Sequence, residues 1–157
     1  MTSYTAPIRD IRFAMDALGL LPALAELPGY TDATPDLRDA LLAEAGKLAE
    51  DLLAPVNFSG DKQGAVLKNG VVRTADGFKE AYAAYVEGGW NSLAFDSEHG
   101  GQGLPWLLGF ATSEMWVSAN NSWGLCPMLT SGAVEMLSAH GSSEQKALYL
   151  EKLVSGK

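Results

Sequence analysis

The sequence predicts an all-α fold, a helical-bundle-like domain with one small β-hairpin near residues 66–72. Apolar residues recur at helical spacing along most of the chain, and prolines or glycines separate the helical segments. With 157 residues, 47% of them hydrophobic, the chain can form a continuous core without disulfides or a structural metal. We expect an N-terminal arm over residues 1–34 and one helical domain over residues 35–157.

Prolines set the limits of the first helices. In the arm, Pro7, Pro22 and Pro28 leave room for only one short helix, around residues 10–18. A long helix is predicted from Pro35, which suits the first helical position, to about Ala54. Its apolar positions are Leu37, Leu41, Leu48 and Leu52, and Thr34 is its expected cap. We expect Pro55 to end this helix.

The next segment combines a hairpin and a helix. Asn69-Gly70 favours the positive φ angles of a tight turn between the apolar pairs at 66–67 and 71–72. A helix then follows over residues 78–86, with Asp76 as its expected cap and Gly88-Gly89 as its end.

A short apolar link over residues 90–95 and a glycine-rich loop over residues 98–103 precede three further helices. The first starts with Pro105 at its first helical position and ends near residues 118–121. The second is predicted from Cys126 to His140. The third begins at Ser142, which has capping-box spacing to Gln145.

Composition excludes several classes of protein. The net charge of −8 argues against a nucleic-acid-binding protein, which needs a basic face, and also disfavours binding to an anionic membrane. No apolar run is long enough for a membrane span. The single cysteine fits a reducing compartment, and we expect a cytoplasmic protein. Charged residues make up only 19% of the chain, which indicates an apolar face meant for a partner or ligand.

The chain contains no convincing catalytic constellation. The cluster Gly100-Gly101-x-Gly103 does not match a dinucleotide-binding motif and is interpreted as a turn between helices. Two histidines are too few for a His-rich metal site, so we expect no metal. His140 suits a helix C-terminus, and His99 a solvated loop. Cys126 is interpreted as a small buried thiol.

Tryptophan is concentrated in one part of the chain. Trp90, Trp106, Trp116 and Trp123 fall within 34 residues. Rigid aromatic side chains on an apolar helical surface either pack a core or line a pocket or interface. Both interpretations remain open for residues 106–129.

Several motifs, in order, resemble the N-terminal helical domain of acyl-CoA dehydrogenases. They are Gly89-Trp90-x-x-Leu93, Glu98-x-Gly100-Gly101-x-Gly103-Leu104, Ser113-Glu114 and the run from Gly141-Ser142-x-Glu144-Gln145-Lys146 to Ser155-Gly156. The opening, Tyr4-x-Ala6-Pro7-x-Arg9-Asp10-x-x-Phe13, resembles the arm of the long bacterial subfamily that includes 3-methylmercaptopropionyl-CoA dehydrogenase. The resemblance covers nearly the whole chain.

The resemblance implies that the parent protein is an FAD-dependent oxidoreductase that converts an acyl-CoA thioester to its trans-2-enoyl form. In that family a β-domain contacts the flavin, and a second helical domain supplies the carboxylate base. Neither is present here, so no catalytic residue is expected in this chain, and no flavin-binding residue is assigned. The implied partners are the acyl-CoA substrate, the remaining domains of the same polypeptide and an electron-transfer acceptor. The full-length enzyme is expected to be a homo-oligomer.

By the same resemblance, this domain would form one wall of the acyl slot. The residues expected to bind substrate lie around positions 110–129: Phe110, Glu114, Met115, Ser118, Leu125, Met128 and Leu129. Glu114 aligns with a carboxylate that the family commonly carries, and we do not assign it as the base. An alternative is a stand-alone helical module that binds a protein or a lipid-like ligand without redox chemistry. A flavin-free homologue with a structural role is a third possibility.

Overall fold

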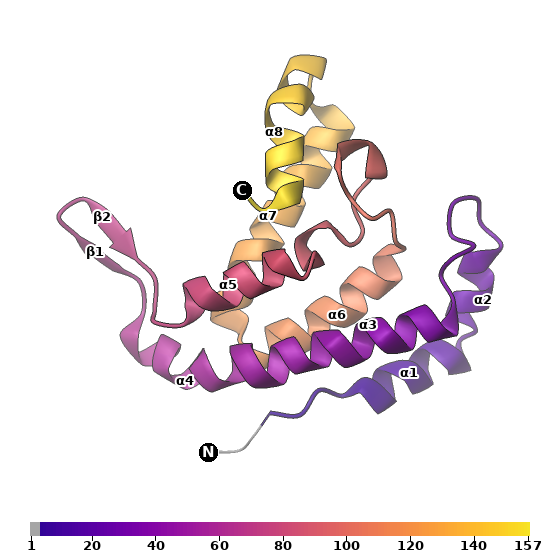
Figure 1. Cartoon of the computed structure of the whole chain (residues 1–157), viewed down its shortest axis with the longest axis horizontal. Helices are drawn as coiled ribbons and strands as arrows, with labels where there is room; N and C mark the ends of the chain where they lie inside the picture. The colour runs from indigo at the N-terminus through magenta and orange to yellow at the C-terminus, as the bar shows by residue number, and fades with distance from the viewer. Residues whose placement is uncertain (1–3) are drawn as a thin grey trace.

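The computed structural model describes residues 4–157 and consists of α-helices with one two-stranded sheet (Figure 1). The all-α class with a small hairpin near residues 66–72 is confirmed. The first half comprises α1 (Ile8–Ala17), α2 (Leu20–Ala25), α3 (Pro35–Lys47), the π-helical segment η1 (Leu48–Leu53), α4 (Ala54–Gln63), β1 (Val66–Lys68) and β2 (Val71–Arg73). The second half comprises α5 (Phe78–Glu87), the 3-10 turns η2 (Trp90–Ser92) and η3 (Ser97–His99), α6 (Trp106–Ala119), α7 (Asn121–His140) and α8 (Ser143–Ser155).

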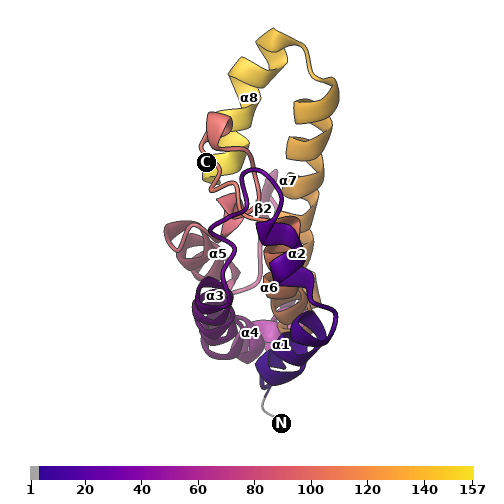
Figure 2. The same ribbon diagram turned by 90° about the vertical axis from the view of Figure 1, so that its right-hand side faces the viewer.

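Two groups of helices define the shape. In Figure 1, α3, η1 and α4 form one continuous curved rod, and α1 and α6 lie along it. The helices α7 and α8 form an antiparallel pair that rises from this body, as Figure 2 shows from the side. No helix within residues 4–157 has both the length and the apolar character needed to cross a membrane.

The hydrophobic core has two parts. The larger one joins the rod, α1, α5 and α6, and its fully buried side chains include Leu42, Leu53 and Met115. The smaller one is made by Phe95, Val134, Leu150 and Val154, where α7 and α8 meet the segment before η3. The cavity described below lies between α5, α6 and α7, next to both parts of the core.

The buried side chain of Arg38, on α3, links this helix to α1. Its guanidinium is ion-paired with Asp16 of α1 and, at 2.8 Å, with Asp39. Burial lowers the pKa of Arg38, but the hydrogen bonds to Asp39 and Asp16 outweigh that effect and raise it overall. The arm is held further by Tyr4, whose hydroxyl donates to the Met115 carbonyl at 2.9 Å. The first residues of the described chain therefore share the core of the helical body.

The helices α2 and α4 are present although the prolines predicted none at these positions. The expectation of a single short helix before residue 34 is wrong, because α2 follows α1. Pro22 is the third residue of α2, where the backbone N–H of a helix has no intrahelical acceptor. The expected end at Pro55 is also wrong, because α4 continues to Gln63. The Ala54 N–H donates to Ala49, five residues back, so the chain passes Pro55 through a wide π-type turn.

The start of α7 lies five residues earlier than Cys126. The side chain of the buried Asn120 caps α7 by accepting a hydrogen bond from the Trp123 N–H at 3.1 Å. Its amide nitrogen donates to the Leu53 carbonyl at 3.2 Å. Because Asn120 links α7 to the rod, the helix begins at Asn121 and Pro127 falls inside it.

Several local predictions agree with the structure, and two are wrong by a residue. Asn69 and Gly70 both have positive φ, 54° and 75°, as the tight hairpin turn requires. Ser142 and Gln145 form the predicted capping box of α8. Asp76 does not cap α5, because Gly77 precedes its first residue with φ 85°. Pro105 is the residue before α6 rather than its first residue.

Candidate functional site

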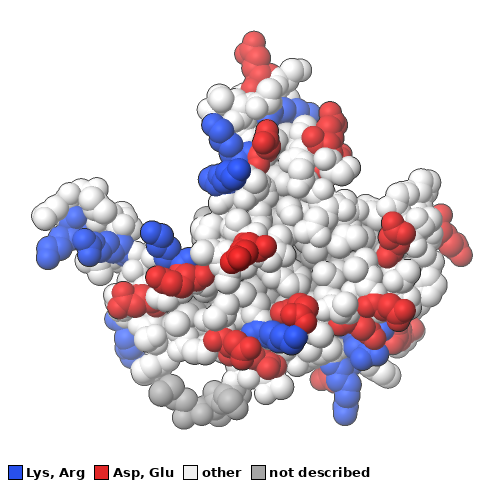
Figure 3. Space-filling view, viewed as in Figure 1, with Lys and Arg blue, Asp and Glu red and all other residues white. Residues whose placement is uncertain are grey.

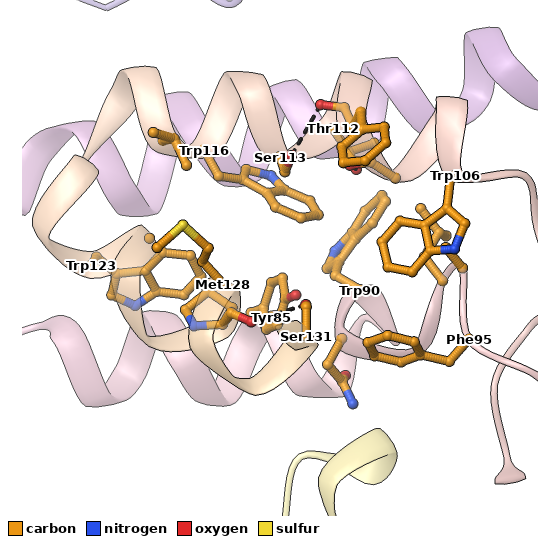
Figure 4. Close-up of a pocket in the computed structure, with 18 residues that line it drawn as sticks. Tyr85, Trp90, Phe95, Trp106, Thr112, Ser113, Trp116, Trp123, Met128 and Ser131 are labelled. Carbon is orange, nitrogen blue, oxygen red and sulfur yellow. Dashed lines mark hydrogen bonds between the residues drawn. The ribbon is translucent and has the colours of Figure 1, made fainter. Parts of the chain in front are cut away.

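A cavity of about 300 Å3 lies between α5, α6, α7 and the segment 90–95. Figure 4 shows aromatic rings on most of its sides, among them Trp90, Trp106, Trp116, Trp123 and Tyr85. All four tryptophans of the chain line it. The core and the pocket interpretations of the tryptophan cluster both apply. Trp116 and Trp123 are buried in the core and also form part of the cavity wall.

The aromatic rings pack against one another edge to face. Tyr85 packs against Trp116 and Trp123 with ring centroids 5.1 and 5.4 Å apart, at interplanar angles of 89° and 80°. Trp90 meets Trp116 at 5.5 Å and 71°. Such T-shaped pairs add stabilisation beyond burial alone. The wall of the cavity is therefore a rigid aromatic cluster.

The indole N–H groups of the two buried tryptophans are bonded to backbone carbonyls. The Trp116 indole N–H donates to the Ala45 carbonyl of α3, and the Trp123 indole N–H donates to the Phe78 carbonyl of α5, both at 3.2 Å. Burial, followed by the influence of Tyr82 and Cys126, raises the pKa of the Tyr85 phenol well above its usual value, so the phenol stays neutral. These groups give the cavity apolar ring faces without a charge.

The threonine and serine hydroxyls that line the cavity are bonded within their own helices. Thr112 donates to the Gly109 carbonyl, and Ser131 donates to the Pro127 carbonyl, both at 3.0 Å. Ser113 donates to the Phe110 carbonyl at 3.0 Å. No carboxylate, histidine, lysine or arginine is among the described residues that line the cavity. The arrangement suits an apolar ligand and offers no acid–base group.

The structure brings together two of the seven residues predicted to bind substrate. Phe110 and Met128 line the cavity and are also largely exposed at its mouth. Met115 is fully buried in the core and does not line the cavity. Glu114, Ser118, Leu125 and Leu129 are exposed and do not line it either. Ser118 lies instead against Tyr4, with 2.7 Å between the two hydroxyl oxygens.

The helical spacing of residues in the sequence indicates two walls of the cavity. On α7 the lining residues Gly124, Pro127, Met128 and Ser131 follow the spacing i, i+3, i+4, i+7. On α6 the lining residues 106, 109, 110, 113 and 117 have the same spacing, and Thr112 and Trp116 widen that face. Tyr85, Trp90 and Phe95 could not be assigned in this way, because they come from another helix and from a segment without regular periodicity.

A second cavity, of about 620 Å3, lies at the base of the hairpin, between α4, α5 and the start of α7. Phe78, Tyr82 and Cys126 are among its lining residues. Burial is the main cause that raises the pKa of the Tyr82 phenol. Cys126 is exposed, so the interpretation of a buried thiol is wrong; the residue lies in the second turn of α7, at the cavity wall.

The glycine-rich loop is a structural turn. The N–H groups of Gly101, Gln102, Gly103 and Leu104 all donate to backbone carbonyls of residues 92–96. A side chain at Gly101 would overlap the Phe95 carbonyl oxygen, because its Cβ would lie 2.0 Å away. These N–H groups are not available to the phosphates of a nucleotide. His99 in this loop is half-buried, and His140 is exposed at the C-terminus of α7.

Neither the glycine-rich loop nor the aromatic cavity fits a flavin dinucleotide. A flavin dinucleotide needs donors for its pyrophosphate, which the occupied N–H groups of the glycine-rich loop do not supply. The aromatic cavity has no cation on its wall among residues 4–157. In the same range, no group of three or more histidine, cysteine or acidic side chains is placed to hold a metal ion.

Comparison with known proteins identifies the family. The family model described as the N-terminal domain of acyl-CoA dehydrogenase matches residues 38–157. The chain is 44% identical to the 3-methylmercaptopropionyl-CoA dehydrogenase of Ruegeria pomeroyi over 155 residues, which cover 99% of this chain and 26% of that protein. It is 30% identical to the broad-specificity linear acyl-CoA dehydrogenase FadE5 of Mycobacterium tuberculosis, covering 93% of this chain and 24% of the relative.

A third relative is the butyryl-CoA dehydrogenase of Syntrophomonas wolfei, which is 30% identical over 159 aligned positions, 98% of this chain and 26% of the relative. The chain thus spans about a quarter of the length of the curated relatives it matches. The match to the family model includes every element from α6 to α8 and therefore both long helices of the aromatic cavity. The chain belongs to the acyl-CoA dehydrogenase family, and it corresponds to the N-terminal domain of these enzymes.

Proposed function

We propose that this domain forms one wall of the acyl-binding slot in an FAD-dependent acyl-CoA dehydrogenase, with the aromatic cavity as the apolar end of that slot. The observation that carries the proposal is the cavity itself, whose wall is mostly aromatic and aliphatic and has no charged side chain within residues 4–157. The relatives are dehydrogenases of different acyl-CoA thioesters, so the part of the ligand that varies among them is the acyl group.

A hydrocarbon acyl chain has no polar atoms beyond its thioester, and a mostly apolar aromatic cavity accepts it with little desolvation cost. At about 300 Å3 the cavity is at the lower end of the range for small-molecule pockets, which favours a short acyl group. Phe110 and Met128 stand at its mouth, where a chain entering from another domain would pass between them. These two side chains are the proposed substrate contacts.

The chemistry of dehydrogenation is assigned to other parts of the polypeptide. Removal of the α-proton needs a base within hydrogen-bond reach of the substrate, and the cavity wall has none among the described residues. Glu114 is exposed on α6 and does not line the cavity. FAD, when bound by the complete enzyme, would accept the hydride from the β-carbon. The chain alone is therefore expected to be inactive and to lack bound flavin.

The experiment compares the chain of residues 1–157 with the polypeptide encoded by the complete reading frame. Each is tested for flavin absorbance and for oxidation of short acyl-CoA thioesters with an artificial electron acceptor. We expect both signals from the complete polypeptide and neither from the chain alone. Robust oxidation by the chain alone would refute this division of roles. A reading frame that ends at Lys157 would favour the stand-alone binding module.

A substitution pair tests the slot itself in the complete polypeptide. Met128→Trp fills the mouth of the cavity, and Leu148→Trp introduces the same ring on α8; both parent side chains are 54% exposed, and only Met128 lines the cavity. We expect Met128→Trp to lower kcat/KM by about tenfold or more, the effect of about 1.4 kcal/mol. Leu148→Trp should leave kcat/KM unchanged, and neither variant should lose flavin. Equal kcat/KM values in both variants would place the acyl group elsewhere.

A further inference from the structure

The hydroxyl of Tyr85 is a polar group in the mostly apolar wall of the aromatic cavity. The Tyr85 side chain is only 5% exposed, and it lines this cavity between Trp123 and Trp90 (Figure 4). Its hydroxyl forms no hydrogen bond with any residue of the described chain. Asn91 Oδ1 is the one side-chain polar atom in residues 4–157 that is both fully enclosed and without a partner. The unbonded Tyr85 oxygen therefore still has access to open space in the cavity.

The other polar groups of the wall are either bonded or closer to water. The threonine and serine hydroxyls donate to carbonyls of their own helices. The side-chain amide of Asn91 donates to the Val154 carbonyl, and its enclosed oxygen cannot meet a ligand. The indole N–H groups of Trp90 and Trp106 also lack a partner among the described residues, but both rings are only half-buried. Tyr85 is thus the most deeply buried of the unpaired donors on this wall.

The Tyr85 phenol is a neutral donor in a fixed position. Burial is the main cause that raises its pKa above the ordinary value of 10.0, so it keeps its proton at neutral pH. Its ring is held edge to face between Trp116 and Trp123. Figure 3 shows charged side chains on the outer surface, over the rod, the hairpin and α8, and none lines the cavity among the described residues. The hydroxyl therefore suits a neutral acceptor atom of a ligand.

A ligand that fills the cavity displaces the water that can reach this hydroxyl. Most of the wall accepts a hydrocarbon chain without losing a hydrogen bond, and the Tyr85 hydroxyl is the exception, because a hydrocarbon leaves it unpaired in an apolar site. A chain with an acceptor atom at this depth replaces the lost water. Sites with a buried hydrogen-bonding group discriminate strongly against analogues that cannot pair with it.

We propose that Tyr85 is a specificity-determining residue, whose hydroxyl donates a hydrogen bond to a neutral acceptor atom within the acyl group. The domain then favours acyl-CoA thioesters whose chain contains such an atom, for example an ether oxygen, over hydrocarbon chains of the same length. This inference rests on the proposed function of the aromatic cavity as the end of the acyl slot. Tyr85 takes no part in proton or hydride transfer, and its effect is on which acyl group is oxidised.

Matched pairs of thioesters test this selectivity in the polypeptide encoded by the complete reading frame. The pairs are 4-methoxybutanoyl-CoA with hexanoyl-CoA and 5-methoxypentanoyl-CoA with heptanoyl-CoA. Within a pair the chain length is equal, and the ether oxygen lies beyond the two carbons that react. For each pair we take the ratio of kcat/KM for the ether to kcat/KM for the hydrocarbon. Tyr85→Phe should lower this ratio by about tenfold or more in at least one pair.

Tyr82→Phe is the matched control. Tyr82 is on the same helix but lines the second cavity and not the aromatic one, so both ratios should keep their wild-type values. Flavin absorbance checks that each variant has folded. Ratios that stay unchanged in Tyr85→Phe, or that fall equally in Tyr82→Phe, would overturn the proposal. A wild type that oxidises both hydrocarbon thioesters about tenfold better than their ether partners would overturn it even if Tyr85→Phe lost its flavin.

Met128→Trp separates this inference from the proposed function. If Met128→Trp lowers kcat/KM for all four thioesters while Tyr85→Phe leaves both ratios unchanged, the acyl slot stands and the selectivity of Tyr85 is refuted. If Met128→Trp changes none of the kcat/KM values, the slot is refuted and the role of Tyr85 with it.

Discussion

The indole N–H of Trp123 donates a hydrogen bond to the backbone carbonyl of Phe78, with 3.2 Å between nitrogen and oxygen. This bond links α7 to the start of α5 across the two cavities, since Trp123 lines both. The same indole ring packs edge-to-face against Tyr85. One side chain thus fixes the separation of two helices that form the proposed acyl slot.

Trp123→Phe is expected to lower the free energy of unfolding by about 1–3 kcal/mol, because the hydrogen bond to the Phe78 carbonyl is lost and the smaller ring leaves a void. Thermal unfolding should show a fall in Tm of about 2–4 °C for each kcal/mol. The matched control is Trp106→Phe, since the Trp106 indole N–H makes no hydrogen bond within residues 4–157. Equal losses in the two variants would show that the bond contributes nothing.

Asn120→Ala is expected to cost about 2–4 kcal/mol. The buried Asn120 side chain caps α7 and also donates to the Leu53 carbonyl of the rod, so alanine removes a cap and a second buried hydrogen bond. Urea unfolding monitored by circular dichroism measures the loss. The neighbouring Asn121→Ala, at an exposed position, should change the free energy of unfolding little. Similar values for both substitutions would contradict the assigned role of Asn120.

The stability of the protein should decline at alkaline pH because of Tyr85. Burial holds the pKa of its phenol above the ordinary value of 10.0, so above that pH the unfolded chain loses a proton that the folded chain keeps. The free energy of unfolding should therefore fall as pH rises, by up to about 1.4 kcal/mol per pH unit for this group. Urea unfolding from about pH 9 to about pH 11 measures the slope.

Tyr85→Phe removes the titrating group and should flatten that slope, whatever its effect on stability at neutral pH. Tyr149→Phe, at an exposed position of α8, serves as the control and should keep the wild-type slope. An unchanged slope in Tyr85→Phe would mean that other groups govern alkaline unfolding.

Elements with strong local signals were predicted correctly. The Asn69-Gly70 turn and the Ser142–Gln145 capping box depend on residues close together in the sequence, so their geometry follows from local conformational preference. The family resemblance has the same basis, since motifs in a fixed order persist in the chain itself, and the family model confirms it.

The errors arose where a distant contact decided the structure. A helix was expected to end at Pro55 and another to start at Cys126, but the π-type turn continues the first helix and Asn120, bonded to Leu53, starts the second one earlier. The cavity could be predicted only in part. The helical faces of α6 and α7 could be derived from spacing, whereas Tyr85 and Phe95 join them only through packing.

The sequence alone determined the helical class, the hairpin, the family and the presence of an aromatic-rich region, because each depends on residue types at short spacing. Tertiary structure alone decided which aromatic rings surround a cavity, that Met115 belongs to the core, and that Phe110 and Met128 both line the cavity. The physical reason is that helical periodicity fixes which face a residue occupies but not which element will cover that face. The packing of all the helices together determines which element covers each face.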